Sequence, residues 1–162
     1  MTKLKIRSAT RHDAKQILRF IQALAEYEKL ADQVSATEPM LIQTLFPESG
    51  SPAAEVQLAF QNDVPVGFAL YFSSYSTFLA KKGIYLEDLF VDPSARGQGV
   101  GEALLKRVAS IAVARGAERL EWSVLDWNKP AIDFYRRRGA NPMNEWTTFR
   151  VDGAALVALG LP

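Results

Sequence analysis

The sequence has no cysteine, a single histidine and almost no net charge. The absence of cysteine excludes disulfides, thiolate metal sites and a covalent cysteine thioester. The 19 Lys and Arg residues nearly balance the 18 Asp and Glu residues, so no overall electrostatic attraction draws the chain to nucleic acid or to an anionic membrane. The histidine, His12, falls in the first turn of a predicted helix, where a surface side chain is more common than a catalytic base. We therefore expect no metal, no nucleic-acid partner and no membrane partner.

Long apolar runs are also missing. No segment approaches the roughly 18 apolar residues that a membrane helix requires. The first residues, Met1 to Arg7, alternate apolar and polar side chains and lack the apolar core of a signal peptide. The 162 residues, 48% of them hydrophobic and 23% charged, have the length and composition of one ordinary globular domain. We expect one domain over residues 1–162, located in the cytoplasm.

The hydrophobic periodicity predicts a mixed α/β (α+β) fold. The predicted strands cover residues 4–9, 55–61, 64–72, 83–91, 119–125 and 146–151. The predicted helices cover residues 11–29, a short segment after Thr37, residues 102–116 and 129–138, and a terminal turn or two at 154–159. Asn62 and Asp63 are residue types that a tight hairpin turn accepts, so the second and third strands should pair antiparallel. Residues 73–82 are predicted to form a loop over one end of the sheet.

A glycine-rich loop, Arg96-Gly97-Gln98-Gly99-Val100-Gly101, follows the strand at residues 83–91 and precedes a helix. Glycines at alternate positions leave the backbone N–H groups unshielded by side chains. The helix adds unpaired N–H groups and the positive end of its dipole. The arrangement predicts a binding site for phosphate oxygens; the alternative is a glycine-rich turn without a ligand.

Two common phosphate-binding motifs do not match this loop. A P-loop ends in Gly-Lys-Ser or Gly-Lys-Thr, whereas Gly101 is followed by Glu102, so the magnesium-binding hydroxyl is missing. The Rossmann fingerprint is Gly-x-Gly-x-x-Gly, and here the third glycine comes one residue early. Too few residues follow Gly101 for the rest of a Rossmann fold, so a dinucleotide is disfavoured as the ligand.

The loop instead resembles the Arg/Gln-x-x-Gly-x-Gly/Ala pyrophosphate loop of the acetyl-CoA-dependent N-acetyltransferase superfamily known as GNAT. Further segments are similar to its spermidine/spermine (diamine) N-acetyltransferase branch: Tyr85–Val91, Trp127–Tyr135 and Arg137–Ala140, with Ile6–Thr10 and Glu26–Glu28 near the front. The resemblance implies a GNAT-type mixed, mostly antiparallel sheet of six to seven strands flanked by about four helices. It also implies a homodimer with its last strands exchanged or packed across the interface.

The resemblance implies acetyl-CoA as the co-substrate and assigns residues to it. The pyrophosphate is assigned mainly to backbone groups of Arg96, Gly97, Gln98, Gly99, Val100 and Gly101. Leu89 and Val91 are expected to offer backbone groups to the pantetheine arm. Asn128 is expected to bond that arm or the strand beside it, the alternative being only a helix cap. Arg137 can reach a CoA phosphate, although a solvated helix end explains the arginines at 136–138 equally well.

Acetyl transfer to an amine requires an unprotonated nitrogen and a proton for the departing thiolate. Tyr135 lies seven residues, about two helical turns, beyond Asn128, and a phenol with a pKa of about 10 suits protonation of a thiolate. The resemblance gives Tyr135 this general-acid role beside acetyl-CoA; the alternative is a buried core tyrosine. Glu87 and Asp88 are adjacent in a strand and should face opposite sides. The resemblance implies that Glu87 is the amine-side base, acting directly or through water; the alternative is a strand-edge carboxylate.

The amine substrate is predicted from the remaining charged and aromatic residues. Glu87 and Asp88, with Glu145 and Trp146 near the start of the last predicted strand, are expected to bind its positive charge. Polyamine acetylators of this branch carry an acidic residue and a tryptophan in the segment corresponding to residues 73–82, and this sequence has neither there. A shorter amine than spermine is therefore favoured.

We therefore predict an acetyl-CoA-dependent N-acetyltransferase acting on a primary amine of a small diamine, polyamine or lysine-like amino acid. With no cysteine to hold an acyl group, the amine should attack directly in a ternary complex. One alternative is an acetyltransferase of protein or peptide amines. Another is a catalytically inactive acyl-CoA-binding module.

Overall fold

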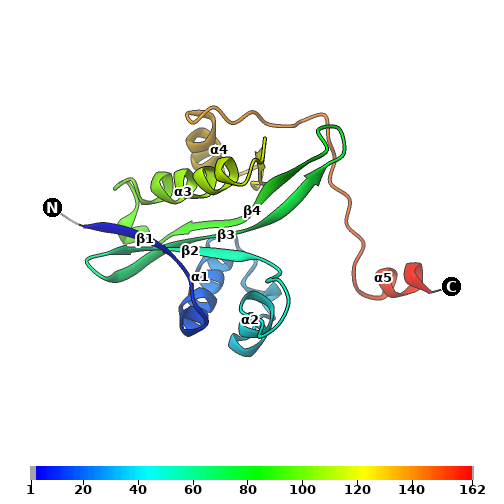
Figure 1. Ribbon diagram of the computed structural model, residues 1–162, viewed down its shortest axis with the longest axis horizontal. Coiled ribbons are helices and arrows are strands. Elements are labelled where there is room, and N and C mark those ends of the chain that lie inside the picture. Colours follow the sequence, from blue (N-terminus) through cyan, green and yellow to red (C-terminus); the bar gives the residue numbers. More distant parts are fainter. Residues whose placement is uncertain (1–2, 162) are drawn as a thin grey trace. The chain divides into compact units, whose positions relative to one another are not determined.

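The computed structural model describes residues 3–161 and divides into two compact units, residues 1–123 and residues 124–162 (Figure 1). Met1, Thr2 and Pro162, which the predicted domain includes, lie outside the described residues. That residues 1–162 form a single domain stays a prediction.

The first unit is built on a five-stranded sheet with the order β1-β2-β3-β4-β5. Its strands are β1 (Leu4–Ser8), β2 (Glu55–Gln61), β3 (Val64–Ser76), β4 (Lys81–Val91) and β5 (Leu120–Glu121). Strands β1 to β4 pair antiparallel, and β5 runs parallel to β4. Asn62 and Asp63 have φ angles of 49° and 64°, which make the tight turn between β2 and β3 that their residue types predict. The predicted class, a mixed and mostly antiparallel sheet, is confirmed.

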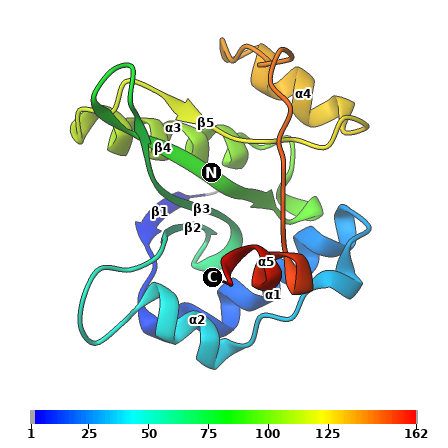
Figure 2. The ribbon, with the colours of Figure 1, turned by 90° about the vertical axis from the view of Figure 1, so that its right-hand side faces the viewer.

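Helices cover both faces of this sheet. Helices α1 (Ala14–Tyr27) and α2 (Glu38–Leu45) lie on one face and α3 (Val100–Ala114) lies on the other (Figures 1 and 2). Three single-turn 3-10 helices are η1 (Arg11–Asp13), η2 (Ala31–Gln33) and η3 (Pro93–Ala95). Thr37 is the N-cap of α2, as the sequence predicts. Its hydroxyl accepts a hydrogen bond from the Met40 backbone N–H at 3.5 Å.

Large apolar side chains form the core between the sheet and α1. Ile17 and Phe20 of α1 are fully buried, and Phe20 stacks on Phe68 of β3 with ring centroids 5.5 Å apart. Phe90 of β4 makes a second aromatic contact with Phe20 at 6.0 Å. Burying each of these side chains stabilises the fold by roughly 1.5–3 kcal/mol. Their packing fixes α1 against β3 and β4.

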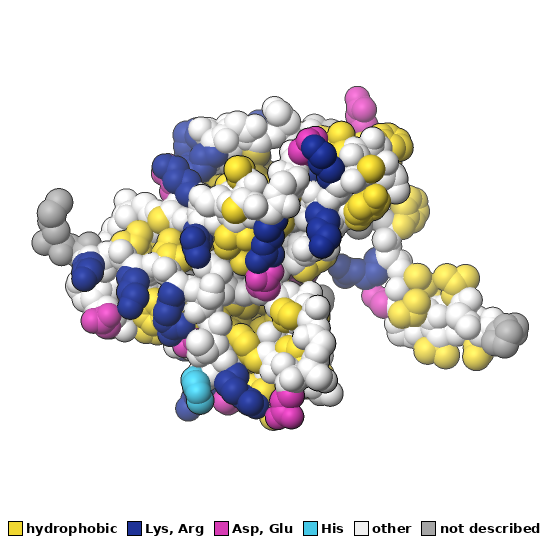
Figure 3. Space-filling view, viewed as in Figure 1, with side chains coloured by type: hydrophobic (Ala, Val, Ile, Leu, Met, Phe, Trp, Pro, Cys, Tyr) yellow, Lys and Arg dark blue, Asp and Glu magenta, His cyan; other side chains and the backbone are white. Residues whose placement is uncertain are grey.

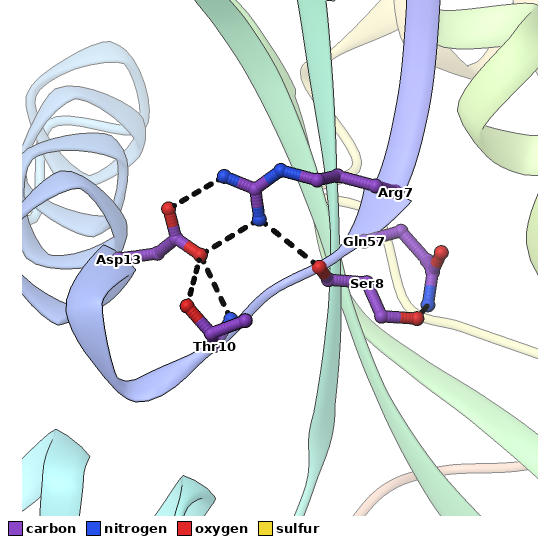
Figure 4. A network of polar contacts seen from close by, with 5 residues as sticks. All are labelled: Arg7, Ser8, Thr10, Asp13 and Gln57. Atoms are coloured by element: carbon purple, nitrogen blue, oxygen red, sulfur yellow. Dashed lines mark hydrogen bonds and ion pairs between the residues drawn. The ribbon is translucent and has the colours of Figure 1, made fainter.

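A polar network holds the entry into α1 (Figure 4). Arg7 of β1 donates two hydrogen bonds to the Asp13 carboxylate, both 2.8 Å long. The same carboxylate accepts from the backbone N–H and the hydroxyl of Thr10 at 2.8 and 3.0 Å. The hydrogen bond from Arg7 is the largest cause that lowers the pKa of Asp13 from 3.8 to about 2. The cap predicted from the Thr10–Asp13 spacing is therefore present and is tied to β1.

Two predicted elements of the first unit differ in extent. Residues 73–82, predicted as a loop, form the far half of the β3–β4 hairpin, because β3 runs to Ser76 and β4 starts at Lys81. Only residues 77–80 form a turn. The polar composition of residues 73–82 favours a loop, but the hydrogen bonds between β3 and β4 keep the other residues of this segment in strands. The strand predicted at residues 119–125 is limited to Leu120–Glu121.

The second unit contains α4 (Lys129–Arg136) and α5 (Gly153–Gly160). The strand predicted at residues 146–151 is wrong, since residues 141–152 are neither strand nor helix. The described residues therefore contain five strands rather than six to seven, and five α-helices rather than about four. An extended segment becomes a strand only when its backbone pairs with a neighbour, and residues 124–161 contain no other strand.

None of the helices between residues 3 and 161 is both long and apolar enough to cross a membrane.

Candidate functional site

The glycine loop, residues 96–101, leads from β4 into α3. Gly97 and Gly99 have φ angles of 73° and 81°, in the left-handed region that residues with a side chain rarely adopt. The Gly99 carbonyl accepts the first helical hydrogen bond from the Ala103 N–H at 2.9 Å, so the N–H groups before Ala103 have no acceptor within the helix. Apart from the glycine itself and its two chain neighbours, no described residue has an atom within 4 Å of the place where a Cβ would stand on Gly97 or Gly99. A ligand can therefore approach this backbone, as an anion site requires.

The side chains of Arg96 and Gln98 in the loop form hydrogen bonds with backbone carbonyls just before the loop. Arg96 Nε donates to the Val91 carbonyl at 2.9 Å, and its guanidinium carbon lies 4.8 Å from the centre of the Tyr27 ring on α1. Gln98 Nε2 donates to the carbonyl of Ser94 at 3.1 Å. These contacts hold the loop against β4 and α1. That backbone groups, more than side chains, bind a phosphate here stays a prediction.

One edge of β4 lacks a partner strand near the loop. Strand β5 pairs with β4 only at Ile84–Leu120 and Tyr85–Glu121. Within residues 3–123, the stretch of β4 from 86 to 91 therefore has no strand on that side. Except for the Val91 carbonyl, which accepts a hydrogen bond from Arg96 Nε, the backbone groups on this edge are available for hydrogen bonds to an extended ligand.

Leu89 and Val91 direct their backbone groups to this edge. The Asp92 N–H donates to the Val66 carbonyl at 2.8 Å, which marks Val66–Asp92 as a hydrogen-bonded pair of the β3–β4 ladder. Such pairs alternate along antiparallel strands, so Leu89 and Val91 point their N–H and C=O groups away from β3. The structure thus places the two predicted pantetheine-binding residues on the unpaired edge, which only Asp92 and the single turn η3 separate from the glycine loop.

The ladder between β3 and β4 is interrupted at Glu87. Leu70 pairs with Asp88 and Tyr71 pairs with Leu86, so Glu87 is an extra residue opposite β3, a β-bulge. The expectation that Glu87 and Asp88 face opposite sides rests on strict alternation, which a bulge breaks. Strict alternation therefore does not hold at this point of the strand, and that the two carboxylates face opposite sides stays a prediction.

Asp88 lies on the α1 face of the sheet, because its ladder partner Leu70 packs in the core cluster with α1. Its burial, followed by the negative charges of Glu87 and Glu28, raises the pKa of Asp88 from 3.8 to about 7. Glu28 is the C-cap residue of α1, and burial raises its pKa as well. Glu87 itself is exposed.

Sequence reasoning missed the part that α1 plays in this site. Glu28 lies far from Asp88 in the sequence, and its one signal was the family-like segment Glu26–Glu28. The contact of Tyr27 with Arg96 is equally non-local. Both contacts follow from the packing of α1 on β3 and β4, which no local pattern encodes.

Helix α4 of the second unit carries three of the predicted residues. Asn128 is its N-cap, and the side-chain oxygen accepts from the Ala131 N–H at 3.4 Å. Tyr135 lies in the last turn, with its ring edge-on to Phe134 at 5.2 Å. Arg137, predicted within the helix, is the exposed C-cap residue instead. Asn128 and Tyr135 thus belong to one helix, as predicted.

Glu145 and Trp146 are exposed and lie in the irregular segment of the second unit, not at the start of a strand. The Trp146 side chain is 75% exposed. The structure brings the loop, the β4 edge and the carboxylates together within the first unit. That the predicted residues of the second unit act on the same substrates stays a prediction.

A family model described as Acetyltransferase (GNAT) family matches residues 19–140. The chain is 42% identical over 165 residues to the thialysine N-epsilon-acetyltransferase of Bos taurus, covering 96% of each protein. It is 35% identical over 198 residues to an L-ornithine N5-acetyltransferase of Arabidopsis thaliana, covering 96% of this chain and 87% of that protein. It is also 31% identical over 167 residues to the spermidine/spermine N(1)-acetyltransferase-like protein 1 of Homo sapiens, covering 97% of this chain and 24% of that protein.

Proposed function

Since the chain belongs to the GNAT acetyltransferase family, we propose that it transfers acetyl from acetyl-CoA to a primary amine of a small diamine, polyamine or lysine-like amino acid. The observation that carries this proposal is a phosphate-type loop at the start of α3, a few residues after an unpaired β4 edge. The names of the bovine and Arabidopsis relatives favour an amino acid with a side-chain amine within this range.

The loop and the strand edge fit the two halves of acetyl-CoA. The open backbone at Gly97 and Gly99 and the first-turn N–H groups of α3 suit the pyrophosphate. The backbone groups of Leu89 and Val91 suit the amides of the pantetheine arm, in the manner of an added strand. Acetyl-CoA supplies the acetyl group as an activated thioester. Asn128 and Arg137 are proposed to complete the donor site.

The amine is proposed to attack the donor directly, because the sequence has no cysteine to hold an acetyl group. The Tyr135 hydroxyl is proposed as the acid that protonates the leaving sulfur. On the amine side, the sequence predicts Glu87 as the base. Asp88 is proposed to bind the positive charge of the substrate, together with the carboxylate and indole of Glu145 and Trp146.

The β3–β4 hairpin supports a short substrate. Residues 73–82 contain no carboxylate to hold the far end of a long polycation. At the hairpin turn, Ser76 is buried and Phe78 is 97% exposed. Lys81 forms an ion pair with Glu118, so the negative charge of this carboxylate close to the hairpin is already paired.

An amine panel tests the substrate class. CoA release from acetyl-CoA would be followed with thialysine, lysine, ornithine, putrescine, spermidine and spermine, each as the sole amine. We expect the amino acids and short diamines to give the highest kcat/KM. Spermine as the best substrate by a wide margin would contradict the argument from the hairpin.

We also propose that the chain forms a homodimer through its C-terminal segment. Residues 146–151 alternate in the manner of a strand but pair with nothing in residues 124–161, and Phe149 is 91% exposed. Apolar side chains also cover α5 (Figure 3, yellow), where Leu156 and Val157 are exposed. Pairing of this segment in a second copy would satisfy its backbone and bury these side chains. Light scattering should give twice the chain mass, and truncation after Asn144 should give the monomer mass.

A further inference from the structure

Asp88 is a carboxyl group held at a defined place on the α1 face of the sheet. The bulge at Glu87 changes the register, so that Asp88 pairs with Leu70, whose side chain is in the buried core. The next residue, Leu89, directs its backbone to the unpaired edge that is proposed to hold the donor. Asp88 therefore lies in β4 at the boundary between the apolar core and the proposed donor site.

The Asp88 carboxyl has no hydrogen-bond or ion-pair partner in the described part of the chain. The charged groups whose fields act on it are carboxylates, Glu87 beside it and Glu28 at the end of α1. The cation of the glycine loop, Arg96, donates its Nε–H to a backbone carbonyl and stacks over Tyr27. Arg19 of α1 is paired with Asp92 at 2.9 Å. Asp88 is thus a partly buried acid without a compensating cation.

We propose that Asp88, rather than the exposed Glu87, accepts the proton that the substrate ammonium must lose, an inference that rests on the proposed acetyl transfer. An N–H bond of the ammonium breaks, the proton goes to an Asp88 oxygen, and the electron pair stays on nitrogen. That pair forms the C–N bond to the acetyl carbon while the C–S bond breaks toward sulfur. Tyr135 protonates the sulfur, and Asp88 later returns its proton to water.

The environment of Asp88 suits a general base at neutral pH. Burial first, and then Glu87 and Glu28, raise the pKa of Asp88 to about 7. Compared with a carboxylate of pKa 3.8, this one binds a proton roughly a thousandfold more tightly. A base is most effective when its pKa lies near the working pH. In this assignment Glu87 and Glu28 supply the negative field that keeps Asp88 basic and attracts a cationic substrate.

The dependence of kcat/KM on pH tests this assignment, because it reports the ionisation of the free enzyme. With a lysine-like amine and saturating acetyl-CoA, wild-type kcat/KM should rise with pH and level off above about pH 7. Asp88→Asn should lose about 10²- to 10³-fold at pH 7. Its kcat/KM should then rise about tenfold per pH unit towards the pKa of the amine, since only the neutral amine can react. Glu87→Gln is the matched comparison: it should keep an inflection, moved to lower pH, because the charge of Glu87 also raises the pKa of Asp88.

Glu28→Gln provides an independent test that leaves Asp88 in place. Removing a like charge lowers the pKa of Asp88, so the inflection should move to lower pH. An Asp88→Asn enzyme that binds acetyl-CoA normally and keeps the wild-type inflection would overturn the assignment, as would loss of the inflection in Glu87→Gln. If the wild type acetylates no amine of the panel, the proposed function itself fails. If it acetylates amines but Glu28→Gln leaves the inflection unmoved, only the role of Asp88 fails.

Discussion

Replacing Asp13 by Asn should destabilise the first unit at neutral pH and progressively less in acid. Asp13 is 14% exposed and accepts four hydrogen bonds, two from Arg7 and two from Thr10 (Figure 4). The hydrogen bond from Arg7 is the first cause of the fall in the pKa of Asp13 from 3.8 to about 2. This difference corresponds to at most about 2.4 kcal/mol. Because the Arg7 side chain is 37% exposed and solvent screens the pair, we expect about 1–2 kcal/mol.

The sign of the pH dependence follows from the direction of the shift. The folded state lowers the pKa of Asp13, so its contribution is complete above pH 4 and is lost as the pH falls through about 2. Urea unfolding at pH 7, 4 and 2 would measure the difference in the free energy of unfolding between wild type and Asp13→Asn. The melting temperature at pH 7 should fall by roughly 2–8 °C.

Asp32→Asn is the matched control for this measurement, because Asp32 is exposed and forms no ion pair within residues 3–161. It should change the free energy of unfolding little at any pH. Equal stability of Asp13→Asn and wild type at pH 7 would refute the argument. A difference that stays constant from pH 7 to pH 2 would refute it equally, because the effect would then not come from the ionised carboxylate.

Two further predictions concern the active site. Gly99→Ala should strain the loop by about 1–2 kcal/mol and so raise the acetyl-CoA KM about five- to tenfold. Gly50→Ala, at a similar φ of 83° in a remote loop, should leave this KM unchanged. Equal effects of the two variants in steady-state kinetics would contradict a donor role for the loop. Tyr135→Phe should lower kcat about 10²- to 10⁴-fold with little change in the acetyl-CoA KM. Tyr75→Phe is the control and should leave kcat unchanged. Undiminished turnover in Tyr135→Phe would remove the acid assignment.

Elements encoded by local patterns could be predicted from the sequence. The apolar side chains of α1 recur at helical spacing, and Ile17 is fully buried where this spacing predicts a core face. The glycine loop is also local, because positive φ angles at Gly97 and Gly99 are what alternate glycines permit. Strand 146–151 shows the limit of such reasoning. Its alternation is real, but a strand also needs a partner, and alternation does not identify one.

The carboxylates of the site depend on non-local structure. Sequence reasoning singled out Glu87 and Asp88 but assumed strict alternation, and the bulge changes which of them faces α1. A bulge depends on the register between two strands, so the sequence of β4 alone does not reveal it. The negative charge of Glu28 acts on Asp88 only because α1 packs across β3 and β4. Local sequence thus supports the proposed donor loop more directly than the proposed proton acceptor.

The most direct test of the central claim is a single assay of acetyl transfer to a lysine-like amino acid. Purified protein, acetyl-CoA and thialysine or ornithine would be incubated, and CoA release and the acetylated product would be quantified together by mass spectrometry. The proposed function predicts one equivalent of product, acetylated on the side-chain nitrogen, for each CoA released. Tight binding of acetyl-CoA by calorimetry with no product from any amine of the panel would contradict it and would indicate an inactive acyl-CoA-binding module.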